Sequence, residues 1–387
     1  MRIFYISDKT PNPAFQSNLW RANLLCSLEK MGFDIEEFEG DLSETFRNLD
    51  TRNSEHLKFI ARNRPVLGKE ILNQVRAAHE REPIDLFFSY LYDACLSPNI
   101  VEEIKALGIK TANFYCNASY QLHLVENISP HYDWCLMVER FRIDDYKAIG
   151  ANPLYFQMAA NPDVYHRLDT AYKYDVTFVG QRYGDRPHHI QALVDNGLDV
   201  RVWGMNWLSA PPVPEPFARR VVRRAGKLFT ADGVDAIKRR LGLAVPSATA
   251  DDIVSHLSAL VGGPIADEEM IKLYSESKIN IGFAGCGETF KGSEKIYQVK
   301  LRDFEIPMSG GFYLVEHCDE LGEFYDLEKE VVTFRSPQEL ADKASYYLAH
   351  EGEREAIRNA GYERCRRDHT WENRFRTAFA EMGLINA

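Results

Sequence analysis

Short apolar runs alternate with segments of helical spacing along the whole chain. Residues 2–7 form an apolar run, residues 17–30 space their leucines as a helix does, and residues 32–35 end that helix and begin another strand. A further helix is expected at residues 99–107. Later strands are predicted at residues 84–90, 111–116, 134–138 and 154–158. This strand–helix–strand order predicts an α/β fold with a parallel sheet.

The same order restarts near residue 174. Residues 175–180 read as a strand, 188–196 as a helix and 198–204 as the next strand, whereas prolines and basic residues interrupt the order between 206 and 264. We interpret residues 206–264 as an insertion. The elements expected after it are helices at 268–277, 337–350, 353–367 and 371–382, and strands at 278–283, 312–316 and 331–334.

Chain length supports a division into two domains. At 387 residues the chain exceeds what one hydrophobic core usually supports. We therefore expect Rossmann-like domains at residues 1–165 and 174–365, followed by a helical segment at 366–387. In open α/β folds, ligands bind outside the carboxyl ends of the strands. Two such domains side by side predict a cleft in which two substrates meet.

Composition excludes several classes of protein. The chain is 45% hydrophobic but has no apolar run of ~18 residues, and its start reads as a strand rather than a signal peptide, so we expect a cytoplasmic location. A net charge of −11 argues against a nucleic-acid partner. The seven cysteines are odd in number and form no Cys-x-x-Cys pair, which disfavours a disulfide framework or a zinc site.

The most informative stretch runs from Arg302 to Val315, where a short polar helix passes through a glycine pair into an apolar strand. A helix that begins near Leu301 directs free N–H groups at an anion, and Arg302 adds a full charge. Glu305 follows one turn later and suits paired hydroxyls. A nucleotide sugar carries both groups. The alternative is that Glu305 only caps or salt-bridges the helix.

This stretch resembles the donor-binding signature of the two-domain GT-B glycosyltransferases, most closely their CgeB-like (spore-maturation-protein-like) group, with its Arg-x-Phe-Glu-x-x-x-x-Gly-Gly segment. The resemblance extends from residue 175 to residue 372 and is looser before it. It implies two Rossmann-like domains facing each other across a cleft, and a C-terminal helix that crosses back to the first domain. It also implies transfer of a sugar from a nucleotide-diphosphate sugar to an acceptor.

The resemblance assigns Glu305 to the ribose hydroxyls of the donor. Related retaining enzymes carry another glutamate eight positions earlier, but this chain has Tyr297 there. Glu288 is the candidate to replace that missing carboxylate from a neighbouring loop. The departure leaves the stereochemical outcome, retaining or inverting, open.

Cations near the departing diphosphate stabilise the charge that develops there. Gly180, Arg182 and Arg186 lie in a loop after the first strand of the second domain and resemble the family's phosphate loop. The alternative is a plain turn with solvated arginines. Lys300 is a lesser candidate, which we interpret as a solvated helix charge.

Small and aromatic residues complete the predicted donor site. Ser309, Gly310 and Gly311 allow backbone to approach the donor, or simply form a tight exit from the helix. Trp203 and Gly204 end a strand where an aromatic ring could stack on the nucleobase, although Trp203 fits a core position equally well.

The acceptor side is expected on loops of the first domain. Candidate contacts are Asn12, Tyr92 and Asn117, and an inverting mechanism would take Asp93 or Asp8 as general base. Aspartates at such places are also favoured as turn or cap residues.

No metal or other cofactor is predicted. His188 and His189 are adjacent on a helix and therefore face apart, and no third ligand is placed nearby in the sequence. The basic run from Arg219 to Lys227 is either a contact with an anionic membrane or acceptor, or an ordinary solvated face.

Two other functions remain open. A nucleotide-sugar epimerase uses the same architecture and would convert the donor without an acceptor, and a non-catalytic protein would bind a sugar nucleotide or a glycan without turnover. An NAD enzyme and a P-loop kinase are disfavoured because their glycine motifs are missing. The nucleobase, the sugar, the acceptor and the oligomeric state are not encoded in any short motif.

Overall fold

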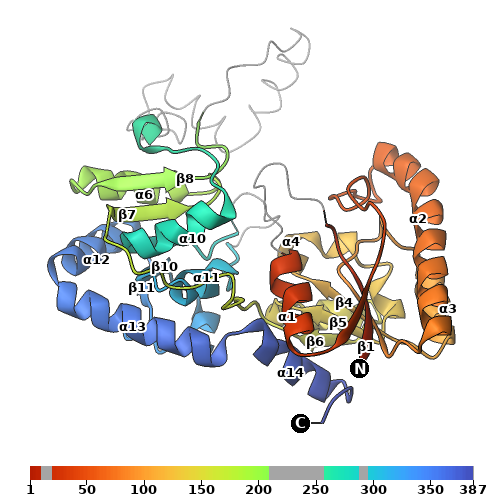
Figure 1. Cartoon of the computed structure of the whole chain (residues 1–387). Helices are drawn as coiled ribbons and strands as arrows, with labels where there is room; N and C mark the ends of the chain where they lie inside the picture. The colour runs from red at the N-terminus through yellow and green to blue at the C-terminus, as the bar shows by residue number, and fades with distance from the viewer. Residues whose placement is uncertain (10–19, 209–256, 287–294, 387) are drawn as a thin grey trace, which may run out of the picture.

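The computed structural model describes residues 1–9, 20–208, 257–286 and 295–386 (Figure 1). Two sheets organise these residues, with strand orders β2-β1-β3-β4-β5-β6 and β11-β10-β9-β7-β8. All neighbouring strands within both sheets are parallel. The predicted α/β class is confirmed, and parallel order places the carboxyl ends of the strands of each sheet at one edge.

The first sheet contains the predicted strands with small changes at their ends. Its strands are β1 (Arg2–Ile6), β2 (Asp34–Glu37), β3 (Leu86–Ser89), β4 (Lys110–Tyr115), β5 (Trp134–Met137) and β6 (Pro153–Tyr155). The associated helices are η1 (Arg21–Leu25), α1 (Cys26–Lys30), α2 (Ser54–Arg81), α3 (Pro98–Ala106), α4 (Ala118–Gln121) and α5 (Ile143–Ala148).

The second sheet follows the restarted pattern. Its strands are β7 (Tyr174–Val179), β8 (Val200–Trp203), β9 (Ser277–Gly282), β10 (Tyr313–Glu316) and β11 (Val332–Phe334). Its helices are α6 (Arg186–Asp195), α10 (Asp267–Glu276), α11 (Arg302–Met308), α12 (Pro337–Ala349) and α13 (Glu351–Asp368), with the 3-10 helix η7 at Asp319–Glu323. Most of the expected insertion, residues 209–256, lies outside the described residues.

The last helix, α14 (Trp371–Glu381), crosses back to the first sheet (Figure 1). Its Phe375 ring lies 5.6 Å from the ring of Phe88 on β3 and 5.2 Å from that of Phe156. Lys30 on α1 also forms a 3.0 Å ion pair with Glu372. The structure thereby confirms the C-terminal crossing that the resemblance implied.

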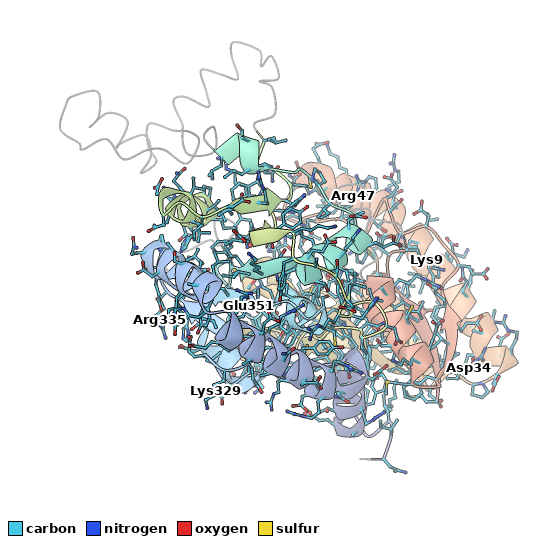
Figure 2. All side chains as sticks on the ribbon, turned by 60° about the vertical axis from the view of Figure 1, so that its left-hand side comes forward. Lys9, Asp34, Arg47, Lys329, Arg335 and Glu351 are labelled. Atoms are coloured by element: carbon cyan, nitrogen blue, oxygen red, sulfur yellow. The ribbon has the colours of Figure 1, made fainter. Side chains whose placement is uncertain are left out.

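Charged side chains cover the outside of both halves, as Lys9, Asp34 and Arg47 on one half and Lys329 and Glu351 on the other illustrate (Figure 2). The seven cysteines are all free thiols. Among the described residues, no helix combines the length and the apolar character that a bilayer crossing requires.

Candidate functional site

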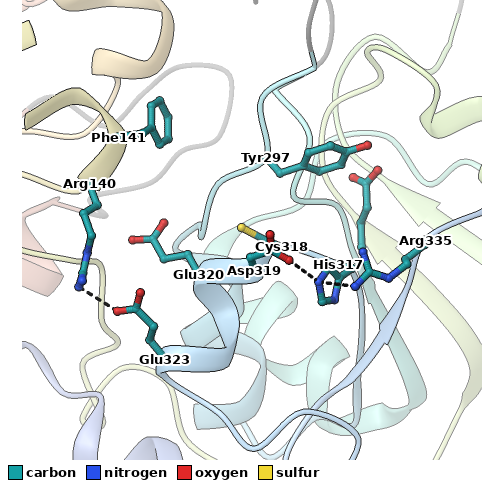
Figure 3. A pocket seen from close by; sticks show the side chains of 10 residues that line it. Arg140, Phe141, Tyr297, His317, Cys318, Asp319, Glu320, Glu323 and Arg335 are labelled. Carbon is teal, nitrogen blue, oxygen red and sulfur yellow. Dashed lines mark hydrogen bonds and ion pairs between the residues drawn. The ribbon is translucent and has the colours of Figure 1, made fainter.

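A cavity of about 810 Å³ opens at the carboxyl edges of both sheets (Figure 3). Arg140 and Phe141 follow β5 of the first sheet, and Arg335 follows β11 of the second. The other lining residues are Tyr297, Glu316, His317, Cys318, Asp319, Glu320 and Glu323. Residues from both halves therefore form one concave surface where open α/β folds bind ligands.

Polar contacts join the two halves beside this cavity. Tyr155 on β6 donates a 2.5 Å hydrogen bond to Glu320, and the Gln157 amide donates to the same carboxylate oxygen at 3.2 Å. Arg140 pairs with Glu323 at 2.9 Å, as Figure 3 shows, and its guanidinium lies 4.2 Å from the centre of the Tyr155 ring. Burial raises the pKa of Glu320. We call these five residues the interdomain latch.

Arg302 and Glu305 lie one turn apart on α11, as the sequence predicted, and they form the ion pair that was the alternative to a contact with the donor. Glu305 is completely buried, and its Oε1 has no hydrogen-bond partner among the residues that the structure describes. Although burial alone would lower the pKa of Arg302, the Glu305 carboxylate raises it above its ordinary value. Neither residue lines the 810 Å³ cavity, so contact between Glu305 and a ligand requires the surrounding side chains to move.

Asp303 and Lys300 anchor the beginning of α11 from inside. The Tyr313 hydroxyl and the Lys300 backbone N–H donate to the Asp303 carboxylate at 2.6 and 2.7 Å. The Lys300 ammonium donates to the carbonyls of Phe283 and Gly285 at 2.8 and 2.7 Å. Burial lowers the pKa of Lys300 to about 7 and raises that of Asp303 to about 6. Lys300 is thus an internal anchor and not the solvated charge we expected.

Arg186 is turned inward, which differs from its predicted contact with phosphate. Its guanidinium donates to the Gln181 carbonyl at 2.7 Å and to the Tyr183 hydroxyl at 2.5 Å, and it stacks 3.7 Å from the centre of the Tyr183 ring. Only 7% of the residue is exposed. Arg186 therefore supports the loop between β7 and α6. The backbone N–H of Arg182 donates to the Met205 carbonyl at 3.0 Å, which fixes that loop against the one after β8.

Gly204 permits the close approach of these two loops. Its φ is 138°, and a Cβ there would lie 2.1 Å from the Gly180 carbonyl oxygen. The Trp207 indole N–H donates to the same oxygen at 2.8 Å. Trp203 packs against Gly262, since a Cβ added to Gly262 would lie 2.2 Å from the indole nitrogen of Trp203. Trp203 is partly buried against Gly262 and Tyr174, which supports the core position that was the alternative to stacking on a nucleobase.

Ser309, Gly310 and Gly311 also pack internally. Ser309 is fully buried, and its carbonyl accepts from the Ser275 hydroxyl at 2.9 Å. A Cβ on Gly310 or Gly311 would lie 2.7 Å from Arg167 or Asn280. The structure supports the tight helix exit, which was the alternative to an approach of backbone to the donor.

The first half places its predicted acceptor residues at the carboxyl ends of strands, with unequal access. Asp93 is fully buried and accepts hydrogen bonds from both the backbone and the side-chain amide of Asn127, at 3.1 and 2.6 Å. Burial raises its pKa to about 6. Asp93 is therefore a loop anchor rather than an accessible base. Asp8 and Asn117 remain partly exposed, and Tyr92 is mostly buried. Asn12, Glu288 and the run from Arg219 to Lys227 lie outside the described residues.

The structure assembles one charged cluster that the sequence did not reveal. The Lys295 ammonium lies 3.0 Å from Asp185 and 2.8 Å from Glu316, although more than a hundred residues separate the two carboxylates. His189 lies beside the two carboxylates. One of its ring nitrogens and one oxygen of each carboxylate lie within 4.8 Å of one another. The expectation that His189 has no further potential ligand nearby is thus wrong. Asp185 and His189 are four residues apart at the start of α6, a spacing that the sequence shows, but only the fold brings Lys295 and Glu316 to them.

Residues 181–380, just over half of the chain, match the model of a family described as glycosyl transferase-like. The chain belongs to that family. It is accordingly a glycosyltransferase, and the match covers the loop after β7, α11 and α14. The match does not distinguish the CgeB-like group from the rest. Among proteins with curated descriptions, no sequence matches this glycosyltransferase.

Solved structures confirm the fold. Sucrose-phosphate synthase from Thermosynechococcus elongatus superposes with a TM-score of 0.57 at 12% identity, over 99% of this chain and 98% of that one. Anabaena Alr3699/HepE in complex with UDP and glucose gives 0.55 at 10% identity, with both chains covered completely. A glycosyltransferase from Rickettsia africae ESF-5 gives 0.52 at 11% identity, over 100% and 99% of the chains. The two facing sheets are therefore the GT-B architecture.

Proposed function

We propose that this glycosyltransferase moves a sugar from a nucleotide-diphosphate sugar to an acceptor bound between its two halves. The observation that carries the proposal is the 810 Å³ cavity, because both sheets contribute their carboxyl edges to it. Its wall is rich in carboxylates, and carboxylates accept hydrogen bonds from sugar hydroxyls. The solved complexes of Alr3699/HepE with UDP, UDP-glucose, and UDP plus glucose support a donor of this class.

The donor nucleotide is proposed to lie against the loop after β7 and the beginning of α11. Arg182 and Arg302 are the cations for its diphosphate, and Glu305 holds the ribose. Within the described part of the chain the Oε1 atom of Glu305 has no partner, which supports this role, since a buried carboxylate oxygen gains a hydrogen bond when a hydroxyl reaches it. Arg302 already holds the other oxygen, which fixes the direction of the carboxylate.

The acceptor is proposed to enter from the first half, where Asp8 and Asn117 follow β1 and β4. The acceptor itself is a glycan, a lipid-linked glycan, a protein or a small molecule. Transfer forms a bond from the acceptor oxygen to the anomeric carbon, breaks the bond from that carbon to the diphosphate, and releases the acceptor proton. We also propose that this reaction proceeds without a resident metal ion.

The test is to incubate the protein with UDP-glucose, and with other common nucleotide sugars in turn, and to follow both products. We expect release of the nucleoside diphosphate together with a sugar that has left the nucleotide, either as free sugar through slow hydrolysis or on an added acceptor. A donor whose sugar is isomerised while still attached would instead establish an epimerase. Binding without any turnover across donors and acceptors would overturn the transferase.

A further inference from the structure

Lys295 lies where two parts of the proposed donor site meet. Asp185 immediately precedes α6 and ends the loop after β7, whereas Glu316 is the last residue of β10 and lines the cavity. The ammonium bridges these carboxylates at 3.0 and 2.8 Å. Its side chain is 31% exposed, and its partner Glu316 lines the cavity. A single side chain therefore connects the loop to the cavity wall.

The surroundings of Lys295 have the composition of a divalent-cation site. Two carboxylates and an imidazole place one ligand atom each within 4.8 Å of one another. The Nδ1 atom of His189 lies 3.1 Å from the Asp185 carbonyl oxygen, and if it donates there, Nε2 keeps its lone pair. Oxygen and imidazole ligands suit Mn²⁺ or Zn²⁺. In this chain, however, an ammonium stands between the two carboxylates.

The ammonium of Lys295 offsets the negative charge of the two carboxylates. Without it, Asp185 and Glu316 would present two negative charges next to the loop that is proposed to meet a diphosphate. Like charges at such separations repel, and the repulsion is strong where water is partly excluded. An ammonium that pairs with both carboxylates reduces the repulsion, and it carries a third N–H donor of the kind that a phosphate oxygen accepts.

We propose that Lys295 is the built-in cation of the donor site. Its ammonium occupies the position that a divalent ion would take among Asp185, His189 and Glu316, and it contacts the diphosphate of the bound nucleotide. The diphosphate contact rests on the proposed function. The occupation of the cation position rests on the geometry of the cluster alone.

The first experiment measures Mn²⁺ binding without nucleotide, by electron paramagnetic resonance, for the wild type and Lys295→Met. Removing the ammonium exposes the three ligands, so we expect Lys295→Met to bind one Mn²⁺ at least about tenfold more tightly than the wild type, which is about 1.4 kcal/mol. A further His189→Ala change should abolish that gain. Equal Mn²⁺ affinity in the wild type and Lys295→Met would overturn the proposal.

Lys343→Met is the matched control. Lys343 also pairs with two carboxylates, Glu328 at 3.2 Å and Glu339 at 3.1 Å, and its side chain is 27% exposed. It lies on α12 and does not line the cavity. We expect Lys343→Met to behave as the wild type does in both experiments. A gain of Mn²⁺ binding there would mean that any bridging lysine produces the effect, and would overturn the special role of Lys295.

The second experiment compares UDP with uridine by calorimetry in the presence of EDTA. Lys295→Met loses a charge-assisted hydrogen bond, so its affinity for UDP should fall about tenfold while its affinity for uridine stays the same. Added Mn²⁺ should restore part of the UDP affinity. If the wild type binds UDP and Lys295→Met binds it equally well, the role of Lys295 fails alone. If the wild type binds no nucleotide of a panel that includes GDP and dTDP, the proposed function fails as well.

Discussion

At the scale of single residues, burial determines the protonation state of His369, with a consequence for stability. Its Nε2 lies 2.7 Å from the Phe324 carbonyl oxygen, and its Nδ1 lies 3.2 Å from the Arg374 guanidinium. Since the arginine must donate, Nδ1 accepts and Nε2 donates, which describes a neutral ring. Burial lowers the pKa of His369 to about 4.

This shift predicts a pH-dependent loss of stability. An unfolded histidine titrates near pH 6.5, so the contribution of His369 is complete above that pH and is lost as the pH falls from about 6.5 to about 4. The loss is on the order of 3 kcal/mol. Chemical denaturation between pH 7.5 and 4.5 measures it. His369→Gln should flatten the dependence in this range, and an unchanged slope would show that other groups cause it.

Gly204 offers a second prediction at the scale of a residue. Its φ of 138° and the 2.1 Å distance from an added Cβ to the Gly180 carbonyl mean that Gly204→Ala must displace the loop after β7. We expect a cost of about 2–4 kcal/mol in the free energy of unfolding, since backbone strain and a steric clash combine.

The control for Gly204→Ala is Gly108→Ala. Gly108 also has a positive φ, of 87°, but an added Cβ would meet no atom of the described residues within 4 Å. Its cost should be about 1 kcal/mol from backbone strain alone. Both free energies come from urea denaturation. Equal losses in the two variants would contradict the close approach of the loops.

At the scale of elements, strands with an apolar pattern could be predicted from the sequence, whereas α2 could not. The structure gives β4 as Lys110–Tyr115 where residues 111–116 were expected, because continuous burial on both faces leaves a continuous apolar run. Helix α2 spans 28 residues, yet polar residues and an internal Pro65 obscure its spacing. Its beginning is set by Asn53, which accepts from two backbone N–H groups.

Side-chain direction was the least predictable property of the site. The sequence placed Arg186 in the loop after β7, whereas the structure makes it the first residue of α6, and nothing local showed that its guanidinium stacks on Tyr183. The sequence offers no reason to select Lys295, because its partners Asp185 and Glu316 are distant from it in the chain. Motifs predict where a residue stands in an element, whereas packing between elements decides what the residue contacts.

Helix α14 provides the prediction that belongs to this scale. Phe375 is completely buried, with ring centres of Phe88, Phe156 and Phe379 within 5.6 Å. Phe375→Ala should lower the free energy of unfolding by about 3–5 kcal/mol, as large cavities do. Thr377→Ala on the exposed face of the same helix should change it by less than about 0.5 kcal/mol. A small loss in Phe375→Ala would contradict the packing of α14 on the first sheet.

For the whole molecule, the interdomain latch joins the two halves beside the shared cavity. The hydroxyl of Tyr155 and the amide of Gln157 both donate to Glu320. Tyr155→Phe keeps the ring under Arg140 but removes the hydrogen bond to Glu320 and the one that the Tyr155 hydroxyl accepts from Gln157, each of which contributes about 1 kcal/mol. We expect a more open average shape, seen as a larger radius of gyration in solution scattering. Tyr346→Phe, which alters an exposed tyrosine on α12, is the control. Identical scattering for all three proteins would contradict the latch.

The central claim is that the region around the loop after β7 and α11 binds a nucleoside diphosphate for sugar transfer. The most direct measurement is thermal stabilisation by UDP, GDP, dTDP, CMP and ADP, because a ligand that binds only the folded state raises its melting temperature. The account predicts that one diphosphate stabilises the wild type clearly and that Arg302→Ala and Glu305→Gln, checked for native folding, lose this response. No stabilisation by any of these nucleotides, or an undiminished response in both variants, would contradict it.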